Sequence, residues 1–182
     1  MPVVIRTAIP SDLGAVTRIY AHHVSHGTGS FETEAPDDTE MARRWREVSG
    51  RGLPWLVADD EGDVVGYAYA AQYRTRPAYR LTVEDSIYIR ADRMGHGLGR
   101  LLLPALLDAA EAGGMRQVIA VIGDSENHAS IALHRRFGFH QAGLLQNVGF
   151  KFGRWLDTVF MQRSLGEAVS EQQTLISKTL RG

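Results

Sequence analysis

The chain of 182 residues contains no cysteine. This absence excludes disulfide bonds, thiolate metal sites and a cysteine nucleophile, and it fits an intracellular protein. The formal net charge is only −1, so we expect neither nucleic acid nor a membrane as partner. No segment approaches the ~20 apolar residues of a membrane helix, and the first apolar run meets Arg6 and Pro10 too early for a signal peptide. We therefore expect a soluble, cytoplasmic protein.

What is present is an ordinary globular composition, with 44% hydrophobic and 23% charged residues. The length suits one compact domain with a sizeable core. An antiparallel meander followed by a strand–helix–strand–helix–strand unit predicts an α+β (mixed α/β) fold and not a doubly wound nucleotide-binding fold. We expect Pro104 to disturb the first turns of its helix. The expected strands cover 3–8, 55–59, 64–72, 83–90, 117–122, 139–147 and 155–163. Two expected helices begin near residues 12 and 37, and two more cover 101–112 and 127–137.

A glycine-rich turn, Met94-Gly-His-Gly-Leu-Gly99, stands between an expected strand and an expected helix. Glycines let the backbone approach a ligand closely, and the unpaired N–H groups at a helix start attract anions, so the turn is typical of a pyrophosphate site. Arg90, Arg93 and Arg100 flank it and would supply counter-charge. The spacing matches neither G-x-G-x-x-G nor a P-loop, which disfavours NAD and ATP. On the turn alone, a plain strand-to-helix loop is the simpler interpretation.

Further motifs follow one another in a definite order. They are Thr82-Val-Glu-Asp-Ser-Ile-Tyr-Ile89, the glycine turn, Asn127 with Ser130 and Leu133-His134, and Val148-Gly-Phe-Lys-Phe-Gly-Arg-Trp-Leu-Asp157. This succession resembles the GNAT superfamily of N-acetyltransferases, and within it the phosphinothricin / methionine sulfoximine acetyltransferases. Met94 departs from the family pattern, which has Gln or Arg there. The resemblance implies a GNAT-like, mostly antiparallel twisted sheet with helices on both faces and acetyl-CoA in the splay between two central strands.

Acetyl transfer to an amine needs a base for the ammonium, polarisation of the thioester carbonyl and a proton for the leaving thiolate. Glu84 is the candidate base, because a partly buried carboxylate beside Val83 and Ile87 holds a proton more tightly. The resemblance implies this role, whereas the residue alone would suggest a solvated strand glutamate. Asp85 points to the opposite face and is the weaker candidate. His134 stands where the resemblance implies the acid, with a locally hydrogen-bonded helix histidine as the equal alternative.

The resemblance also implies the groups that bind acetyl-CoA, the co-substrate. Backbone groups of one strand would contact the pantetheine arm, and the glycine turn would hold the pyrophosphate. Asn127 is a favourable helix N-cap, to which the resemblance adds a pantetheine contact. The predicted cofactor-binding residues are Ile87, Tyr88, Ile89, Gly95, His96, Gly97, Leu98, Gly99, Arg100 and Asn127.

Arg74 and Arg76, beside Tyr73 and Tyr79, can form a fork for a carboxylate or a phosphinate-like acid, although loop arginines usually face solvent. The resemblance adds Phe31 as a substrate lid. The predicted substrate-binding residues are Phe31, Arg74, Thr75, Arg76, Glu84, Asp85 and Ser86. Three further residues of the last family segment are interpreted as structural, namely Lys151, Trp155 and Asp157.

His22, His23 and His26 lie close in sequence, and residues four apart share a helix face. Such a cluster can hold a metal, but no cysteine and no carboxylate at ligand spacing accompanies it. We therefore expect no metal cofactor.

Together these observations predict an acetyltransferase domain over residues 1–165 and a polar tail over 166–182 that frays. The predicted reaction is direct acetyl transfer from acetyl-CoA to the α-amino group of a small amino-acid-like acceptor, such as phosphinothricin, methionine sulfoximine or methionine sulfone. The resemblance implies a homodimer. Two alternatives stay open: acetylation of a protein N-terminus or lysine, which needs an open peptide groove, and a non-catalytic acyl-CoA-sensing module, which the presence of Glu84 disfavours.

Overall fold

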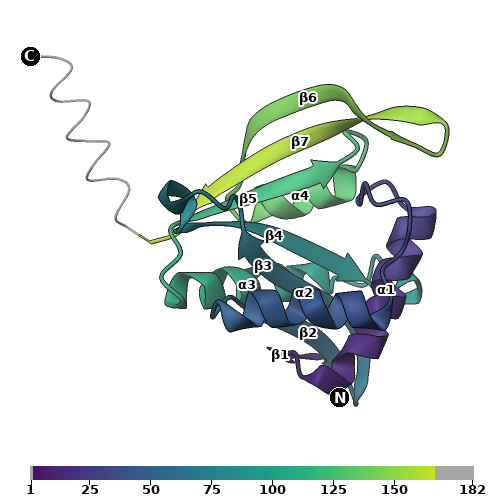
Figure 1. Ribbon diagram of the computed structural model, residues 1–182, viewed down its shortest axis with the longest axis vertical. Helices are drawn as coiled ribbons and strands as arrows, with labels where there is room; N and C mark the ends of the chain where they lie inside the picture. Colours follow the sequence, from purple (N-terminus) through teal and green to yellow (C-terminus); the bar gives the residue numbers. More distant parts are fainter. Residues whose placement is uncertain (1, 167–182) are drawn as a thin grey trace, which may run out of the picture.

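The computed structural model describes residues 2–166, which fold into one sheet and four α-helices (Figure 1). The strand order is β1-β2-β3-β4-β5-β7-β6, so the expected mixed α/β fold is confirmed. The strands are β1 Val4–Thr7, β2 Trp55–Asp60, β3 Asp63–Gln72, β4 Thr82–Ile89, β5 Gln117–Gly123, β6 His140–Lys151 and β7 Arg154–Ser164. The helices are α1 Leu13–His26, α2 Asp38–Gly50, α3 Gly99–Ala112 and α4 His128–Arg136, with short 3₁₀ turns η1 Pro10–Asp12, η2 Pro77–Tyr79 and η3 Ala91–Arg93.

The pairing of β4 with β5 is the one parallel pairing among these strands, and it is short. Its register runs only from Thr82 opposite Gln117 to Asp85 opposite Ala120. Both strands continue beyond this point, β4 to Ile89 and β5 to Gly123, without facing partners in each other. The two halves of the sheet therefore diverge, as the separated tips of β4 and β5 show in Figure 1.

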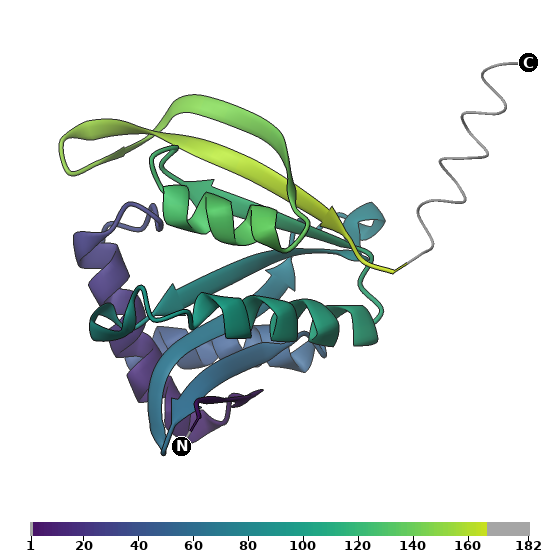
Figure 2. The ribbon, with the colours of Figure 1, turned by 180° about the vertical axis from the view of Figure 1, so that it is seen from behind.

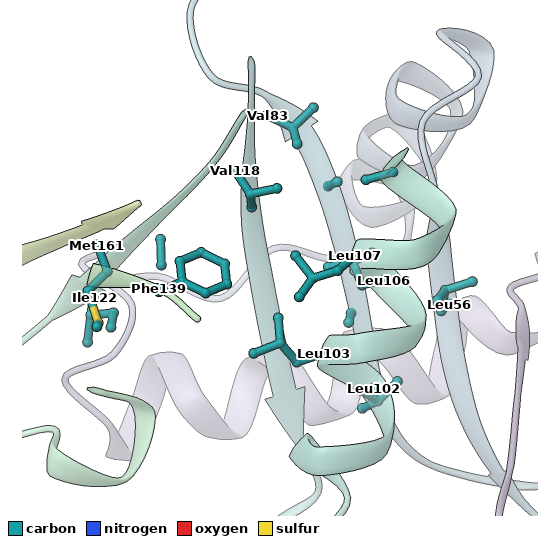
Figure 3. Close-up of a cluster of buried hydrophobic side chains, with 14 of the residues drawn as sticks. Leu56, Val83, Leu102, Leu103, Leu106, Leu107, Val118, Ile122, Phe139 and Met161 are labelled. Carbon is teal, nitrogen blue, oxygen red and sulfur yellow. The ribbon is translucent and has the colours of Figure 1, made fainter. Parts of the chain in front are cut away.

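Each face of the sheet is covered by two helices, with a separate core beneath each pair. On one face α1 and α2 pack over Trp55 and Tyr67, and on the other α3 and α4 lie across the sheet (Figure 2). The leucines of α3 recur at helical spacing and point into the sheet among Leu56, Val83 and Val118 (Figure 3). Each buried leucine contributes about 1.5–3 kcal/mol, so this core fixes α3 and the glycine turn at its start.

The structure differs from the sequence-based expectations at Pro104 and at the β6–β7 hairpin. The expectation that Pro104 disturbs its helix is wrong, because α3 runs unbroken from Gly99 and loses only the one backbone hydrogen bond that Pro104 cannot donate. The strands β6 and β7 are longer than expected, since Phe152 and Gly153, both with positive φ, close a tight two-residue hairpin turn. The prediction that the polar tail frays concerns residues from 167 onward, which lie outside the described part of the chain.

Candidate active site

The divergence of β4 and β5 opens a cavity of about 510 Å³. Its wall is built by the second half of β4, the end of β5, one side of α4, the glycine turn and the last turn of α1. Backbone groups of β4 past Asp85 face this space without a β5 partner, so they can pair with the amides of a ligand. The predicted site residues on the wall are Asp85, Ser86, Ile87, Tyr88, Ile89, Gly95, Gly99, Asn127 and His134.

The three glycines of the turn serve different purposes. Gly95 and Gly97 have φ values of 79° and 83°, a conformation in which a side chain would be strained. Gly99 is needed for packing, because a Cβ there would lie 2.9 Å from Cδ2 of Leu133 on α4. The turn therefore brings the start of α3 close to α4, at one end of the cavity.

The start of α3 is suited to an anion. The amides of Gly95, Gly97, Leu98 and Gly99 donate to no residue among 2–166, and they gather at the positive end of the helix. Less positive charge is available to a ligand at this turn than the three flanking arginines predict. The guanidinium of Arg90 pairs with Asp63 and Asp92, and that of Arg93 pairs with Asp60.

Arg100 is exposed and has no carboxylate partner in the described part of the chain. Of the three flanking arginines it is therefore the one available to a phosphate. His96 is exposed too, whereas Leu98 is buried in the α3 core and can offer a ligand only its backbone. Met94, at the position where the family has Gln or Arg, is 53% exposed and lines the cavity.

Glu84 lies in β4 just before the strands diverge, on the face covered by α1 and α2. Its side chain is half-buried, and it makes no hydrogen bond or ion pair with any residue of 2–166. Burial raises the pKa of Glu84 above its usual 4.5; the charge of Asp85 adds to this, and that of Arg74 opposes it. An unpaired carboxylate with raised proton affinity can accept a proton from a substrate.

Asp85 points to the other face, where it is buried against His134 of α4. Nε2 of His134 lies 2.9 Å from Oδ2 of Asp85, and Nδ1 lies 2.8 Å from the backbone carbonyl of Ser130. Because the Ser130 carbonyl can only accept, Nδ1 carries a proton, and a second proton is shared between Nε2 and Asp85. Burial alone would lower the pKa of His134, but the hydrogen bond and charge of Asp85 and the Ser130 carbonyl raise it.

The predicted substrate residues fall in two places. Arg74, Thr75 and Arg76 are exposed between β3 and β4, with the Arg74 guanidinium stacked 4.5 Å from the centre of the Tyr73 ring. Phe31 lies in the segment after α1, with its ring against Gly123 at the end of β5 and Gly149 of β6. Arg74 lies near enough to Glu84 for its charge to lower the pKa of that carboxyl, and Glu84 and Ser86 share the β4 face beside Tyr69.

Asn127 caps α4, with its side-chain oxygen accepting a hydrogen bond from the amide of Ser130 at 3.3 Å, so the capping prediction is confirmed. The histidines at the end of α1 line the cavity. Nε2 of His23 donates to the carbonyl of Ile89 at 2.7 Å, while His22 and His26 stack on each other. In residues 2–166 no group of three ligand-type side chains is arranged to hold a metal, and no helix is long and apolar enough to cross a membrane.

Two residues beside the cavity make contacts that the sequence pattern does not specify, although Lys151 is among the residues interpreted there as structural. Asp124 follows β5 and is buried, and its φ of 72° is a conformation that few residues other than glycine adopt, asparagine and aspartate among them. Lys151 is buried to 5% exposure and donates to backbone carbonyls of the segment after α1. In β6 only Gly149 and Lys151 are buried. No hydrophobic pattern in the sequence therefore indicates that Lys151 is buried.

This combination of a splayed sheet, an anion-binding helix start and an unpaired carboxylate describes an enzyme that transfers a group from a long, phosphate-bearing donor. Residues 5–160 match the family described as the acetyltransferase (GNAT) domain. The chain belongs to the GNAT acetyltransferases, as its motifs predicted, and it is an N-acetyltransferase.

Three relatives illustrate the similarity. The chain is 56% identical over 161 residues to the phosphinothricin N-acetyltransferase of Alcaligenes faecalis, covering 88% of this chain and 82% of that protein. It is 44% identical over 167 residues to the L-methionine sulfoximine/L-methionine sulfone acetyltransferase of Pseudomonas aeruginosa, covering 91% and 96%. The crystal structure of a GNAT superfamily phosphinothricin acetyltransferase from Sinorhizobium meliloti in complex with AcCoA superposes with a TM-score of 0.90 at 47% identity, covering 93% and 92%.

Proposed function

We propose that this enzyme acetylates the α-amino group of a small amino-acid-like acceptor of the phosphinothricin, methionine sulfoximine or methionine sulfone type, with acetyl-CoA as donor. The names of the similar proteins support the acceptor class and the donor. The cavity fits the donor chemically: β4 offers unpaired backbone groups for amides, and the start of α3 offers free N–H groups for a pyrophosphate. When bound there, the thioester supplies an electrophilic carbonyl.

One observation supports the mechanism most strongly, namely the unpaired and half-buried carboxylate of Glu84. A structural glutamate at this burial would normally have a cationic or hydrogen-bonding partner. Because Glu84 has neither within residues 2–166 and its pKa is raised, it is suited to accept the proton of an incoming ammonium. It does so at the point where β4 and β5 part.

The transfer is direct and needs no enzyme-bound intermediate. Glu84 takes a proton from the substrate ammonium, directly or through one water. The freed amine attacks the thioester carbonyl, so that a C–N bond forms and the C–S bond breaks. The amide nitrogen loses its second proton to solvent, and the departing thiolate takes one proton from the Asp85–His134 pair. That pair lines the cavity and holds one shared proton, which it can supply to the thiolate.

A thiol-release assay tests the proposal. Phosphinothricin, methionine sulfoximine and methionine sulfone are compared with ordinary amino acids and with peptides that have free N-termini. We expect turnover of the sulfoximine or phosphinothricin, reduced at least ~100-fold by Glu84→Gln. The matched control is Glu47→Gln on the exposed side of α2, which should leave turnover unchanged.

Turnover of peptides alone would replace the proposed acceptor with a protein N-terminus or lysine. Tight binding of acetyl-CoA with no turnover of any amine would instead support the sensing module. Full activity of the Glu84→Gln enzyme would remove Glu84 as the base while leaving the acceptor class intact.

We further propose that two copies associate through the β6–β7 hairpin. Large apolar side chains on this hairpin are exposed, and no described residue covers them. Phe150 and Trp155 are 59% and 61% exposed, with ring centres 5.2 Å apart. Light scattering should give twice the chain mass of 20.1 kDa, and the double variant Phe150→Ser with Trp155→Ser should give one chain mass. Val4→Ser, an equally exposed position on β1, is the control; a wild-type protein of one chain mass would refute the dimer.

We also infer a cytoplasmic location, because acetyl-CoA is an intracellular metabolite and the chain has no cysteine. Acetyltransferase activity should appear in the soluble intracellular fraction of the producing cell. Activity confined to the membrane or the extracellular fraction would contradict this.

A further inference from the structure

The segment that leaves α1 passes across the end of β5 and forms part of the cavity wall. We call residues 27–31 the mouth loop. Gly27, Thr28 and Gly29 line the cavity, and Phe31 follows after Ser30. Both views of the ribbon show this segment beside the tip of β5 and below the β6–β7 hairpin (Figures 1 and 2). The loop has no regular secondary structure, so contacts from elsewhere must hold it in place.

Lys151, at the end of β6, provides one anchor. Its Nζ donates hydrogen bonds to the carbonyl of Gly27 at 2.8 Å and to that of Ser30 at 2.7 Å. The side chain is 5% exposed and has no carboxylate partner within ion-pair distance in the described chain. Burial lowers the pKa of Lys151, and the more distant charge of Glu32 opposes this. Burying an ammonium group costs free energy, and here the two backbone carbonyls are the groups that offset this cost.

Asp124 provides the second anchor from the end of β5. Its Oδ2 accepts a hydrogen bond from Oγ1 of Thr28 at 2.9 Å. Asp124 is itself fixed by Arg154 at 2.6 Å and by the amide of Glu126 at 3.1 Å. The four residues from Gly27 to Ser30 are thus held at both ends and in the middle by side chains from β5 and the β6–β7 hairpin.

The ring of Phe31 lies in a slot between two glycines. A Cβ on Gly149 of β6 would be 2.3 Å from Cε2 of the ring, and a Cβ on Gly123 of β5 would be 2.8 Å from Cε1. Real side chains do not approach so closely, so each glycine is required for the ring to sit there. The ring is nevertheless 38% exposed, so part of it remains available for contact from outside.

We propose that Lys151 is a positioning residue, which fixes the mouth loop and Phe31 and thereby sets which amine substrates the enzyme accepts. Gly149 completes this device by limiting where the Phe31 ring can lie. The inference rests on the proposed function for its substrate readout. The alternative is that these contacts stabilise the fold and do nothing to substrate selection.

Lys151→Met tests this, because methionine keeps the length and apolar stem but removes the ammonium. We expect the KM for the amine to rise ~10-fold or more, while the Kd for acetyl-CoA, measured by calorimetry without amine, changes less than ~2-fold. Hydrogen exchange of the amides in the mouth loop should accelerate at the same time. Arg46→Met removes an exposed cation of α2 that pairs with no side chain of residues 2–166, and it should change none of these quantities.

Gly149→Ala is the complementary variant, because its Cβ forces the Phe31 ring outward. It should change the ratio of kcat/KM between a small and a larger amine by at least ~5-fold. Thr28→Val, which removes the Asp124 anchor and keeps the side-chain shape, replaces Lys151→Met if that variant does not fold. Unchanged amine KM together with unchanged exchange in the mouth loop overturns the inference. If the wild type turns over no amino-acid-like amine, the proposed function fails, and the exchange measurement alone still decides whether Lys151 positions the loop.

Discussion

The buried pair of Asp85 and His134 gives a prediction whose magnitude follows from its contacts. Asp85→Asn keeps the shape of the side chain but removes its charge. Nδ1 of His134 must still donate to the carbonyl of Ser130, so in the variant Nε2 is left as an acceptor that can receive a hydrogen bond from the new amide. A charged hydrogen bond is thus exchanged for a neutral one, and no buried group loses its last partner.

Hydrogen bonds to charged groups contribute about 1.5–3 kcal/mol and neutral ones about 0.5–1.5, so Asp85→Asn should lower the free energy of unfolding by about 1–2 kcal/mol. His134→Ala is more severe, because within residues 2–166 Oδ1 of Asp85 already has no partner and Oδ2 would lose its only one. Leaving such a carboxylate buried costs about 3–5 kcal/mol. At about 2–4 °C per kcal/mol for a domain of this size, the two variants should be clearly separated in Tm.

The effect of Asp85→Asn should also depend on pH. The pKa of His134 is raised above its ordinary value of 6.5, so the folded chain holds the ring proton more tightly than the unfolded chain. The stabilisation is therefore complete below about pH 6.5 and is lost as the pH rises through the raised pKa. Urea unfolding should show a larger difference in unfolding free energy between wild type and Asp85→Asn near pH 5.5 than near pH 9. Asp108→Asn, at an exposed position of α3, is the control. Equal losses at both pH values, or a milder His134→Ala, would refute the shared proton.

Three further outcomes follow from the same structure. Because the pKa of Glu84 is raised, kcat/KM should increase as the pH rises through that pKa, above 4.5, and a pH–rate profile of Glu84→Gln should lack this limb. Gly97→Ala, at φ 83°, should lower the unfolding free energy by about 1–2 kcal/mol and weaken acetyl-CoA binding by calorimetry; unchanged stability would show that the turn can relax. Leu103→Ala, at a fully buried position of α3, should lower the unfolding free energy by about 2–5 kcal/mol in urea, and a loss below about 1 kcal/mol would contradict the packing described.

The sheet and helices were predictable because their apolar residues recur at the periods that burial on one face demands. Leu102, Leu103, Leu106 and Leu107 recur at helical spacing and predicted α3 despite Pro104. The end of β6 was not predictable in the same way, because its exposed apolar residues and buried lysine reverse the usual relation between polarity and burial. A strand whose outer face is not covered within its own chain carries no clear alternating signal.

The anchors of the mouth loop were also beyond sequence reasoning. Lys151 lies 124 residues from Gly27, and no local pattern states that its ammonium is buried against that carbonyl. Asp124 lies 96 residues from Thr28, and its positive φ depends on the loop that it supports. Such contacts are set by how β5 and the hairpin pack, which short-range periodicity cannot specify.

The two neighbouring acids of β4 show how far the periodicity does reach. Alternation along a strand predicts that Glu84 and Asp85 face opposite ways, and the pairing of Glu84 with Ala71 and of Asp85 with Ala70 fixes that register. Alternation does not predict that one face holds His134 while the other gives Glu84 no partner in the described part of the chain. A slip of one residue would exchange the two acids, placing the longer glutamate against His134 and the aspartate on the face covered by α1 and α2. The assignment of base and ion pair therefore depends on the register of β4, which β3 and the short β5 pairing hold up to the point where the sheet opens.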